Sequence, residues 1–236
     1  MINNATQIYA IGGGGFSHLH KESKNDLVLE EYLLGLVPKN PKIGYIGHAN
    51  NDDILRIERF YRRFSGVAKT CHLKVEAFPE EVSNFFFDID ILYVGGGSTK
   101  RLLNYWFQID IVKSIESSVE NGLILAGVSA GAMCWFDQVV TGSSTEGYEL
   151  MTGMGIVRGA LCPHFNSEPK RKEIFQNYIL KNKVPFGIAI EEGVAVHISG
   201  NKIVEIINAR NGAAYIITSS GNVLEVSILK SGDRLP

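Results

Sequence analysis

The sequence Gly-Val-Ser-Ala-Gly at residues 127–131 follows a short apolar run. A serine with a glycine two residues before it and two after it, between a strand and a helix, is the pattern of a nucleophile elbow. Such a turn exposes the hydroxyl of Ser129 above the sheet edge and lets the N–H of Ala130 donate to an oxyanion. The same pattern is also explained by an ordinary strand-to-helix turn, in which small residues only permit close packing. Other residues of the chain must therefore distinguish a nucleophile elbow from such a turn.

A serine hydroxyl becomes an effective nucleophile when an imidazole accepts its proton and a carboxylate orients that imidazole. His164 is the candidate base, because it lies just downstream of the expected loop over the site and Pro163 stiffens its approach. Glu191 and Glu192 both end a nearly continuous apolar run, and either would reach the same sheet edge if that run pairs beside the Ser129 strand. Solvated turn residues would be the ordinary interpretation of both glutamates.

Two glycine runs also follow apolar segments. The run at residues 95–97 could supply a second backbone N–H to an oxyanion, although a tight turn without a ligand explains it as well. The run at residues 12–15 lacks the spacing of a dinucleotide loop, and no clear acidic residue closes a second strand. We interpret it as a turn near the active-site edge and keep nucleotide binding as an alternative.

The elements that must position these groups alternate between strand and helix. The hydrophobic pattern predicts strands at 7–11, 42–47, 71–78, 89–94 and 123–128. It predicts helices at 27–36, 53–64, 100–107 and 111–121. This order indicates an α/β protein with a mostly parallel, doubly wound sheet in a three-layer arrangement.

The second half of the chain has a different pattern of predicted elements. We expect a loop over the site at 139–148 and a helix at 168–180. Strands are predicted at 184–190, 194–198, 202–207, 213–218 and 223–229. The later strands read as antiparallel hairpins that extend the sheet. No linker and no repeat is visible, so residues 1–236 are expected to form a single domain.

The composition excludes several classes of protein. The chain has 236 residues, 45% of them hydrophobic, and a formal net charge of −2 with no dense basic block, which gives no reason to expect nucleic acid or an anionic membrane as a partner. The amino terminus shows no signal-peptide pattern, and no apolar run reaches the roughly 18 residues of a membrane span. The three cysteines have no C-x-x-C spacing and no zinc motif occurs, so neither a metal nor a cofactor is expected. A cytoplasmic location is the expectation.

Four motifs occur in order along the chain: Gly-Gly-Gly-Ser-Thr, Gly-Val-Ser-Ala-Gly-Ala, Pro-His-Phe-Asn and Ile-Glu-Glu-Gly. Together they resemble the serine peptidase family of aspartyl dipeptidase (peptidase E) and cyanophycinase, over nearly the whole chain. The resemblance implies a fold related to the class I glutamine amidotransferases and a Ser-His-Glu triad. It makes Ser129 the nucleophile, His164 the general base and then acid, and Glu192 the orienting carboxylate.

The resemblance also implies an oxyanion hole and, less directly, a substrate pocket. The N–H of Gly96 or Gly97 would join that of Ala130 in the oxyanion hole. Aspartyl dipeptidases carry an Asp in the loop after the nucleophile's helix, whereas residues 141–146 of this chain offer hydroxyls and Glu146. An aspartyl substrate needs a cation, which Arg171 or Lys170 could supply, although a solvated helix face explains both. The substrate-binding set expected from the sequence is Ser98, Thr99, Glu146 and Arg171.

The expected function is hydrolysis of peptide bonds through an acyl-enzyme, in short peptides that include Asp-containing ones. The order Ser…His…Glu separates the chain from α/β-hydrolases, in which the histidine comes last. One alternative is a cyanophycinase-like hydrolase of a β-aspartyl-arginine polymer, which the scarcity of arginines after His164 disfavours. The other is a non-catalytic binding protein on the same scaffold, which the intact Ser/His/Glu set disfavours. The expected partner is a peptide substrate, and a monomer or a homodimer is compatible with the sequence.

Overall fold

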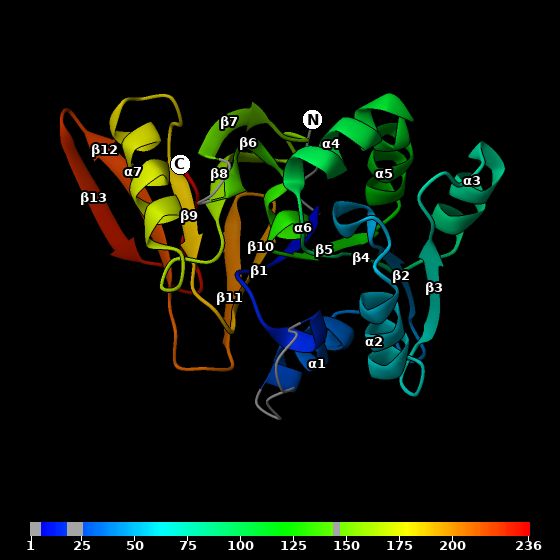
Figure 1. The fold of residues 1–236 in the computed structure, drawn as a ribbon. Coiled ribbons are helices and arrows are strands. Elements are labelled where there is room, and N and C mark those ends of the chain that lie inside the picture. The colour runs from blue at the N-terminus through cyan, green and yellow to red at the C-terminus, as the bar shows by residue number, and fades with distance from the viewer. Residues whose placement is uncertain (1–5, 18–25, 144–146) are drawn as a thin grey trace.

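The computed structural model describes residues 6–17, 26–143 and 147–236. Its central sheet has seven strands in the order β11-β10-β1-β5-β4-β2-β3 (Figure 1). Their bounds are β1 Gln7–Ile11, β2 Lys42–Ile46, β3 Lys69–Leu73, β4 Ile91–Val94, β5 Ile124–Val128, β10 Val194–Ser199 and β11 Lys202–Asn208. Strands β1 to β5 pair in parallel, and β10 and β11 pair antiparallel at one edge.

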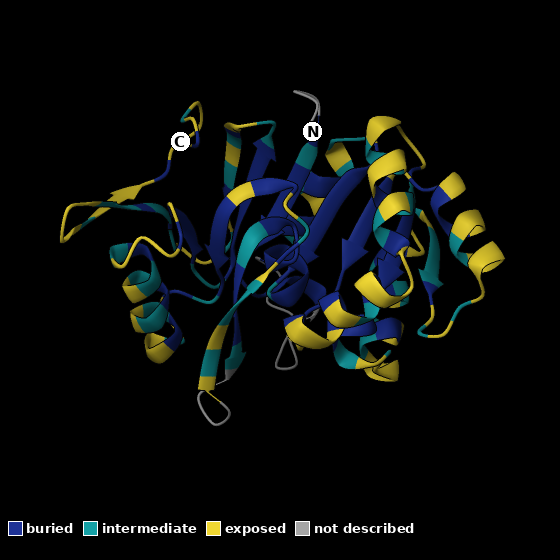
Figure 2. Ribbon diagram, turned by 90° about the horizontal axis from the view of Figure 1, so that it is seen from above, coloured by how far each residue is buried: buried dark blue, intermediate teal, exposed yellow. Residues whose placement is uncertain are grey.

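Helices cover both faces of this sheet, which makes three layers. Their bounds are α1 Leu27–Gly35, α2 Ile54–Phe64, α3 Pro79–Phe87, α4 Thr99–Gln108, α5 Ile111–Glu120 and α6 Ala130–Met133. Helices α1 and α2 pack against one face through a core that includes Leu33, Phe60 and Phe64, and α3 to α6 pack against the other (Figure 1). Figure 2 shows the strands buried and the outer faces of the helices exposed. The predicted α/β class with a mostly parallel central sheet is confirmed.

Six further strands form a second sheet, in the order β13-β12-β9-β8-β6-β7. Their bounds are β6 Phe136–Ser143, β7 Gly147–Thr152, β8 Val157–Cys162, β9 Gly187–Ile190, β12 Ala214–Ser220 and β13 Val223–Ile228. Helix α7 (Pro169–Leu180) packs on this sheet. Of the later strands, β10 and β11 extend the central sheet as an antiparallel hairpin, as expected, whereas the hairpin of β12 and β13 belongs to the second sheet.

The prediction of a loop at 139–148 is wrong. Strand β6 and strand β7 form an antiparallel hairpin there, whose register pairs Gly142 with Tyr148. The Gly/Ser/Thr content suggested a loop, but Val139 and Val140 are both buried, as in a strand that is covered on two faces. Residues 144–146 of the expected loop lie outside the described ranges.

The strand expected at 71–78 is also too long. Strand β3 ends at Leu73, and the unpredicted helix α3 begins at Pro79. The start signals of this helix were present in the sequence, with proline at the first helical position and two glutamates in the first turn. The side chain of Glu81 accepts a hydrogen bond from the N–H of Phe78 at 2.7 Å, which completes the cap.

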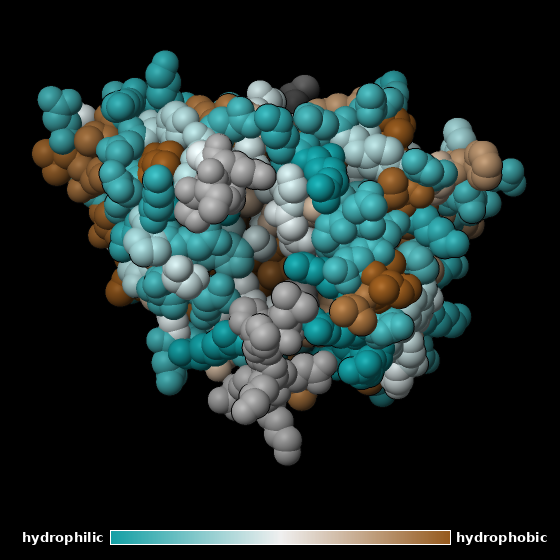
Figure 3. Space-filling view, in the orientation of Figure 1, coloured by the Kyte–Doolittle hydropathy of each residue, from teal (hydrophilic) through white to brown (hydrophobic). Residues whose placement is uncertain are grey.

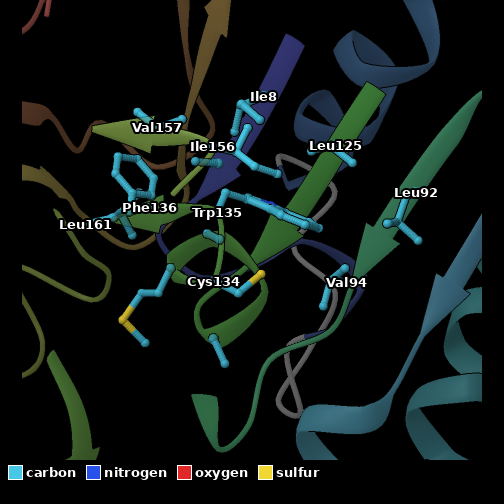
Figure 4. Close-up of a cluster of buried hydrophobic side chains, with 14 of the residues drawn as sticks. Ile8, Leu92, Val94, Leu125, Cys134, Trp135, Phe136, Ile156, Val157 and Leu161 are labelled. Carbon is cyan, nitrogen blue, oxygen red and sulfur yellow. The ribbon is translucent and has the colours of Figure 1, made fainter. Parts of the chain in front are cut away.

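A buried cluster beneath α6 fixes the place of the serine turn. Helix α6 has only four residues, and Trp135 follows it into the core between the two sheets. Figure 4 shows Trp135 among Ile8 and Leu125 of the central sheet and Phe136 and Val157 of the second sheet. The short helix therefore cannot shift without disturbing the packing of both sheets. None of the helices in the described ranges is both long and apolar enough to cross a membrane.

Candidate active site

Three neighbouring parallel strands, β1, β5 and β4, end at the same edge of the central sheet, where open α/β sheets place their ligand sites. Each is followed by a segment that the sequence had singled out: the glycines at 12–15, Ser129, and the glycines at 95–97. Ser129 has a backbone φ of 55° and ψ of −113°. A non-glycine residue in that region is strained, as the serine of a nucleophile elbow is.

The glycines on either side of Ser129 permit this turn by close backbone contact. A β-carbon on Gly127 would overlap the carbonyl oxygen of Gly131, and one on Gly131 would overlap the carbonyl oxygen of Val94. The N–H of Ser129 donates to the carbonyl of Ile11 at 3.0 Å, which ties the turn to β1. The strain at Ser129 is therefore imposed by packing on both sides.

The structure brings the three side chains Ser129, His164 and Glu192 together. The Nε2 atom of His164 lies 2.6 Å from Ser129 Oγ, and its Nδ1 atom lies 2.7 Å from Glu192 Oε1. An ionised carboxylate only accepts hydrogen bonds, so Nδ1 carries the proton and Nε2 is left to accept the proton of the serine hydroxyl. The imidazole and the carboxylate are each 18% exposed, which leaves a narrow approach from solvent.

Asn166 and Ser167 support this arrangement, and the sequence analysis assigned neither of them a role. The side-chain oxygen of Asn166 accepts a hydrogen bond from the N–H of Glu192 at 3.1 Å. The hydroxyl of Ser167 lies 3.1 Å from the carbonyl oxygen of His164 and 3.3 Å from Glu192 Oε1. Both follow His164 within three residues, so the segment that carries the imidazole also positions the carboxylate.

The choice between the two glutamates is decided by where their side chains lie. Glu191 faces β12, where its carboxylate accepts hydrogen bonds from the N–H of Ala213 and the hydroxyl of Tyr215, both at 3.0 Å. Glu192 contacts His164. Adjacent residues at a strand end point in opposite directions, which explains why only one of the pair reaches the imidazole.

The glycines at 12–15 face acidic side chains. A β-carbon on Gly13 would overlap the carboxylate of Glu192, and one on Gly15 would overlap that of Glu30. Asp26 accepts from the N–H of Gly15 at 3.2 Å and pairs with Arg210. Carboxylates where a nucleotide phosphate would sit disfavour the nucleotide-binding alternative, and the run serves as a turn at the active-site edge.

Glu30 is fully buried beneath this turn. Its Oε1 accepts from the N–H of Phe16 at 3.0 Å, and its Oε2 lies 3.6 Å from Nε of Arg63. Burial raises the pKa of Glu30 to about 7, because removal from water penalises the carboxylate more than the hydrogen bond and Arg63 favour it.

Of the residues expected to supply oxyanion donors, Gly96 and Ala130 lie beside Ser129, and Gly97 lies against Ala49. A β-carbon on Gly96 would lie 3.3 Å from the β-carbon of Ser129. Gly97 has a φ of 146° and is so close to Ala49 that a β-carbon would overlap its carbonyl oxygen. Ala130 follows Ser129 as the first residue of α6.

The expected substrate-binding residues have different surroundings in the structure. Ser98 caps α4 by accepting from the N–H of Arg101 at 3.2 Å, and Thr99 is buried. Arg171 is also buried, with its guanidinium donating to Glu168 and to the carbonyls of β6. These contacts hold the guanidinium against β6, and Arg171 also lines the cavity that contains Lys170. Glu146 lies outside the described residues.

Two cavities of about 330 and 310 Å³ border the site. They share Gly142 and Tyr148 of the hairpin; the first extends to Ser98 and Lys100, and the second to Ser167 and Lys170. Figure 3 shows a largely hydrophilic face that is hollowed near its centre. A larger cavity of about 850 Å³ lies at the opposite ends of the strands. Ser129, His164 and Glu192 line none of these three cavities, but Ser167, which contacts Glu192, lines the second of the smaller two.

Comparisons with known proteins identify relatives of the chain. Residues 7–206 match the sequence profile of peptidase family S51. The uncharacterized peptidase YgaJ of Bacillus subtilis is 32% identical over 210 residues, which cover 88% of this chain and 89% of that protein. Peptidase E of Actinobacillus pleuropneumoniae serotype 5b is 25% identical over 125 residues, 48% of this chain and 52% of that one.

Solved structures show the same fold. A peptidase from an acI-B1 actinobacterium superimposes with a TM-score of 0.71 over 98% of this chain and 96% of its own, at 19% identity. A putative peptidase E from Listeria monocytogenes EGD-e gives a TM-score of 0.63 over 85% and 97%, at 18% identity. With the profile match over most of its length and a 32% identical relative along nearly all of it, the chain belongs to peptidase family S51 and is a serine-type peptidase.

Proposed function

We propose that the chain hydrolyses peptide bonds through a Ser129-His164-Glu192 triad. The observation that carries the proposal is the pair of hydrogen bonds on His164, 2.6 Å to the serine and 2.7 Å to the glutamate. They fit one tautomer, with the free lone pair of the imidazole directed at the nucleophile. The strained backbone of Ser129 adds independent support, since it holds the hydroxyl at the end of β5.

In the first half of the reaction, Ser129 Oγ attacks the carbonyl carbon of the scissile bond and its proton passes to His164 Nε2. The resulting oxyanion accepts hydrogen bonds from the N–H groups of Ala130 and of the turn at 95–97. The C–N bond then breaks, and His164 gives its proton to the leaving amine. In the second half a water molecule attacks the acyl-enzyme, His164 accepts its proton, and the acid leaves with Ser129 restored.

The proposed substrates are short peptides, Asp-containing ones among them. The two bordering cavities together hold no more than a few residues, and each includes a lysine. Lys170 is exposed in the cavity that contains Ser167, the neighbour of Glu192, so it can pair with a substrate carboxylate. Lys100 in the other cavity forms an ion pair with Glu149 at 2.7 Å, so it is the less available cation.

The test is a peptide panel. Wild type and Ser129→Ala are incubated with Asp-Xaa, Glu-Xaa and neutral dipeptides, a longer peptide and cyanophycin, and the released amine is followed. We expect hydrolysis of Asp-Xaa dipeptides by wild type and a loss of at least about 10³-fold in Ser129→Ala. Cleavage of only the longer peptide or the polymer would overturn the substrate assignment and keep the mechanism. Equal hydrolysis by both proteins would overturn the mechanism.

A further inference from the structure

The carbonyl oxygen of Gly96 accepts two side-chain hydrogen bonds from the same side. Asn50 Nδ2 donates at 2.9 Å and Arg56 Nη1 at 3.2 Å. A carbonyl oxygen has two lone pairs, so this acceptor is saturated. The donors come from the segment between β2 and the first turn of α2, about 40 residues before the glycine turn that they hold.

This pairing fixes the direction of the Gly96–Gly97 peptide. None of the peptide bonds in the described ranges is cis, and in a trans peptide the C=O and N–H point in opposite directions. With the Gly96 carbonyl turned toward α2, the Gly97 N–H faces the other way. Gly96 itself abuts Ser129, since a β-carbon on it would lie 3.3 Å from that of the serine. The same segment holds the turn at a second point, where the N–H of Ser98 donates to the Ala49 carbonyl at 2.8 Å.

Neither donor is explained by its local structure. Arg56 is half-buried in the first turn of α2, where a cation opposes the helix dipole and the turn itself contains no acidic residue. The cap of this helix is supplied by Asp53, which accepts from the N–H groups of Leu55 and Arg56. Asn50 is held by the N–H of Asp53, which donates to its Oδ1 at 2.9 Å and turns its NH₂ toward Gly96.

We propose that Arg56, together with Asn50, is a positioning residue for the oxyanion hole: it holds the Gly96–Gly97 peptide and polarises it, so that the Gly97 N–H donates to the oxyanion formed at Ser129. The inference rests on the proposed function. A charge-assisted bond to the carbonyl oxygen draws electron density from the peptide and strengthens its N–H as a donor. The positive charge of Arg56 therefore strengthens the Gly97 N–H as a donor, in addition to holding the peptide in place. A residue that only packed against the turn would lack this electrostatic effect.

The test compares Arg56→Met, Arg56→Lys and Asn50→Asp with wild type and with Arg62→Met, an exposed arginine on the same helix that serves as the matched control. For each protein kcat and KM are measured on the best peptide of the panel, together with the affinity for a peptide aldehyde, whose adduct mimics the tetrahedral oxyanion. The ¹H shift of the Gly97 amide in ¹⁵N-glycine-labelled protein reports the polarisation without any substrate.

Loss of one oxyanion donor lowers kcat by about 10²–10³-fold in other enzymes, so weakening one should lower it by about 10-fold or more. We expect this in Arg56→Met with KM nearly unchanged, a parallel loss of aldehyde affinity, and an upfield move of the Gly97 amide. Arg56→Lys should restore most of kcat, and Arg62→Met should match wild type. Asn50→Asp keeps the acceptor for Asp53 but faces the Gly96 carbonyl with a second acceptor, so it should lose at least as much kcat as Arg56→Met.

Three results would overturn the inference: wild-type kcat in Arg56→Met, equal loss in Arg56→Met and Arg56→Lys, or a Gly97 amide shift that none of the substitutions moves. A failure of the proposed function has a different signature. Wild type would then hydrolyse nothing in the panel, while the Gly97 amide shift would still decide whether Arg56 polarises this peptide.

Discussion

The carboxylate of Glu192 lies against the α-carbon of Gly13, so closely that a β-carbon at residue 13 would overlap it. The backbone also joins the two segments, since the N–H of Gly193, the residue after Glu192, donates to the Gly13 carbonyl at 2.8 Å. Glu192, the third member of the proposed triad, therefore rests against the turn that follows the first strand. The run that follows β1 consists of glycines because a β-carbon there would overlap the acidic side chains that surround it.

Substitution of Gly13 by alanine should displace Glu192 and release the orientation of His164. We expect kcat/KM to fall by about 10²-fold, because the imidazole then spends most of its time away from Ser129. The control is Gly35→Ala at the end of α1, where a β-carbon meets no atom within 4 Å. Full activity in Gly13→Ala, with the fold intact by circular dichroism, would show that the position of Glu192 does not depend on its contact with residue 13.

The two adjacent glutamates provide a matched pair of variants. Glu192→Gln should lower kcat by about 10³–10⁴-fold with little change in thermal stability, because the amide no longer secures the imidazole with its proton on Nδ1. Glu191→Gln should instead keep kcat within a few-fold and lower the melting temperature, since it weakens the acceptor for Ala213 and Tyr215. Measurement of kcat and melting temperature on both variants checks the assignment, which the reverse pattern would refute.

Substitutions of Lys170 and Arg171 should have different effects, the first on substrate binding and the second on stability. Lys170→Met should raise KM for Asp-Xaa dipeptides by about 10-fold and leave neutral dipeptides unaffected, because one exposed ion pair to the substrate is lost. Arg171→Met should destabilise the protein for all substrates, since it leaves the carbonyls of Val140 and Gly142 and the carboxylate of Glu168 without their donor. Melting curves and KM values for both peptide classes test this division. An Asp-selective rise of KM in Arg171→Met alone would reverse it.

The buried Glu30 should make stability depend on pH. Its pKa rises from 4.5 in the unfolded chain to about 7 in the folded protein, so below pH 4.5 both states hold the proton. As the pH rises to 7, the unfolded chain releases the proton while the folded protein keeps it. The free energy of unfolding therefore falls across this window by roughly 3 kcal/mol and is level above it.

Glu30→Gln removes this titration while keeping an oxygen that can accept from the N–H of Phe16. Urea unfolding of wild type and Glu30→Gln at pH 4.5, 6 and 7.5 measures the effect. The difference between the two free energies of unfolding should change by roughly 3 kcal/mol across the series. A constant difference would mean that Glu30 has the same pKa in the folded protein as in the unfolded chain.

The sequence predicted the local parts of this site and missed those that depend on tertiary pairing. The turn at Ser129 was readable because its glycines stand within two residues of it. Asn50 and Arg56 were not found, because a polar loop and a charged helix residue look solvated until the chain brings Gly96 against them. The second sheet was missed for a similar reason: a strand pattern shows which residues are buried and not which strand lies beside them.

The glutamate of the proposed triad illustrates the same limit. Residues and spacing left Glu191 and Glu192 open, and the resemblance to a peptidase family favoured Glu192. The structure shows the physical difference, since the two carboxylates point to opposite sides of the strand end and only Glu192 reaches His164. A one-residue change of register reverses such an assignment, and no local sequence signal fixes the register.

The central claim is that His164 activates Ser129 as a nucleophile, and covalent labelling tests it most directly. Wild type, Ser129→Ala, His164→Ala and the exposed-site control Ser117→Ala are treated with a fluorophosphonate, and the adduct is located by peptide mass spectrometry. The account predicts one adduct on Ser129 in wild type and Ser117→Ala, none on residue 129 in Ser129→Ala, and labelling at least about 10²-fold slower in His164→Ala. Equal labelling rates in wild type and His164→Ala, or an adduct on another serine, would contradict it.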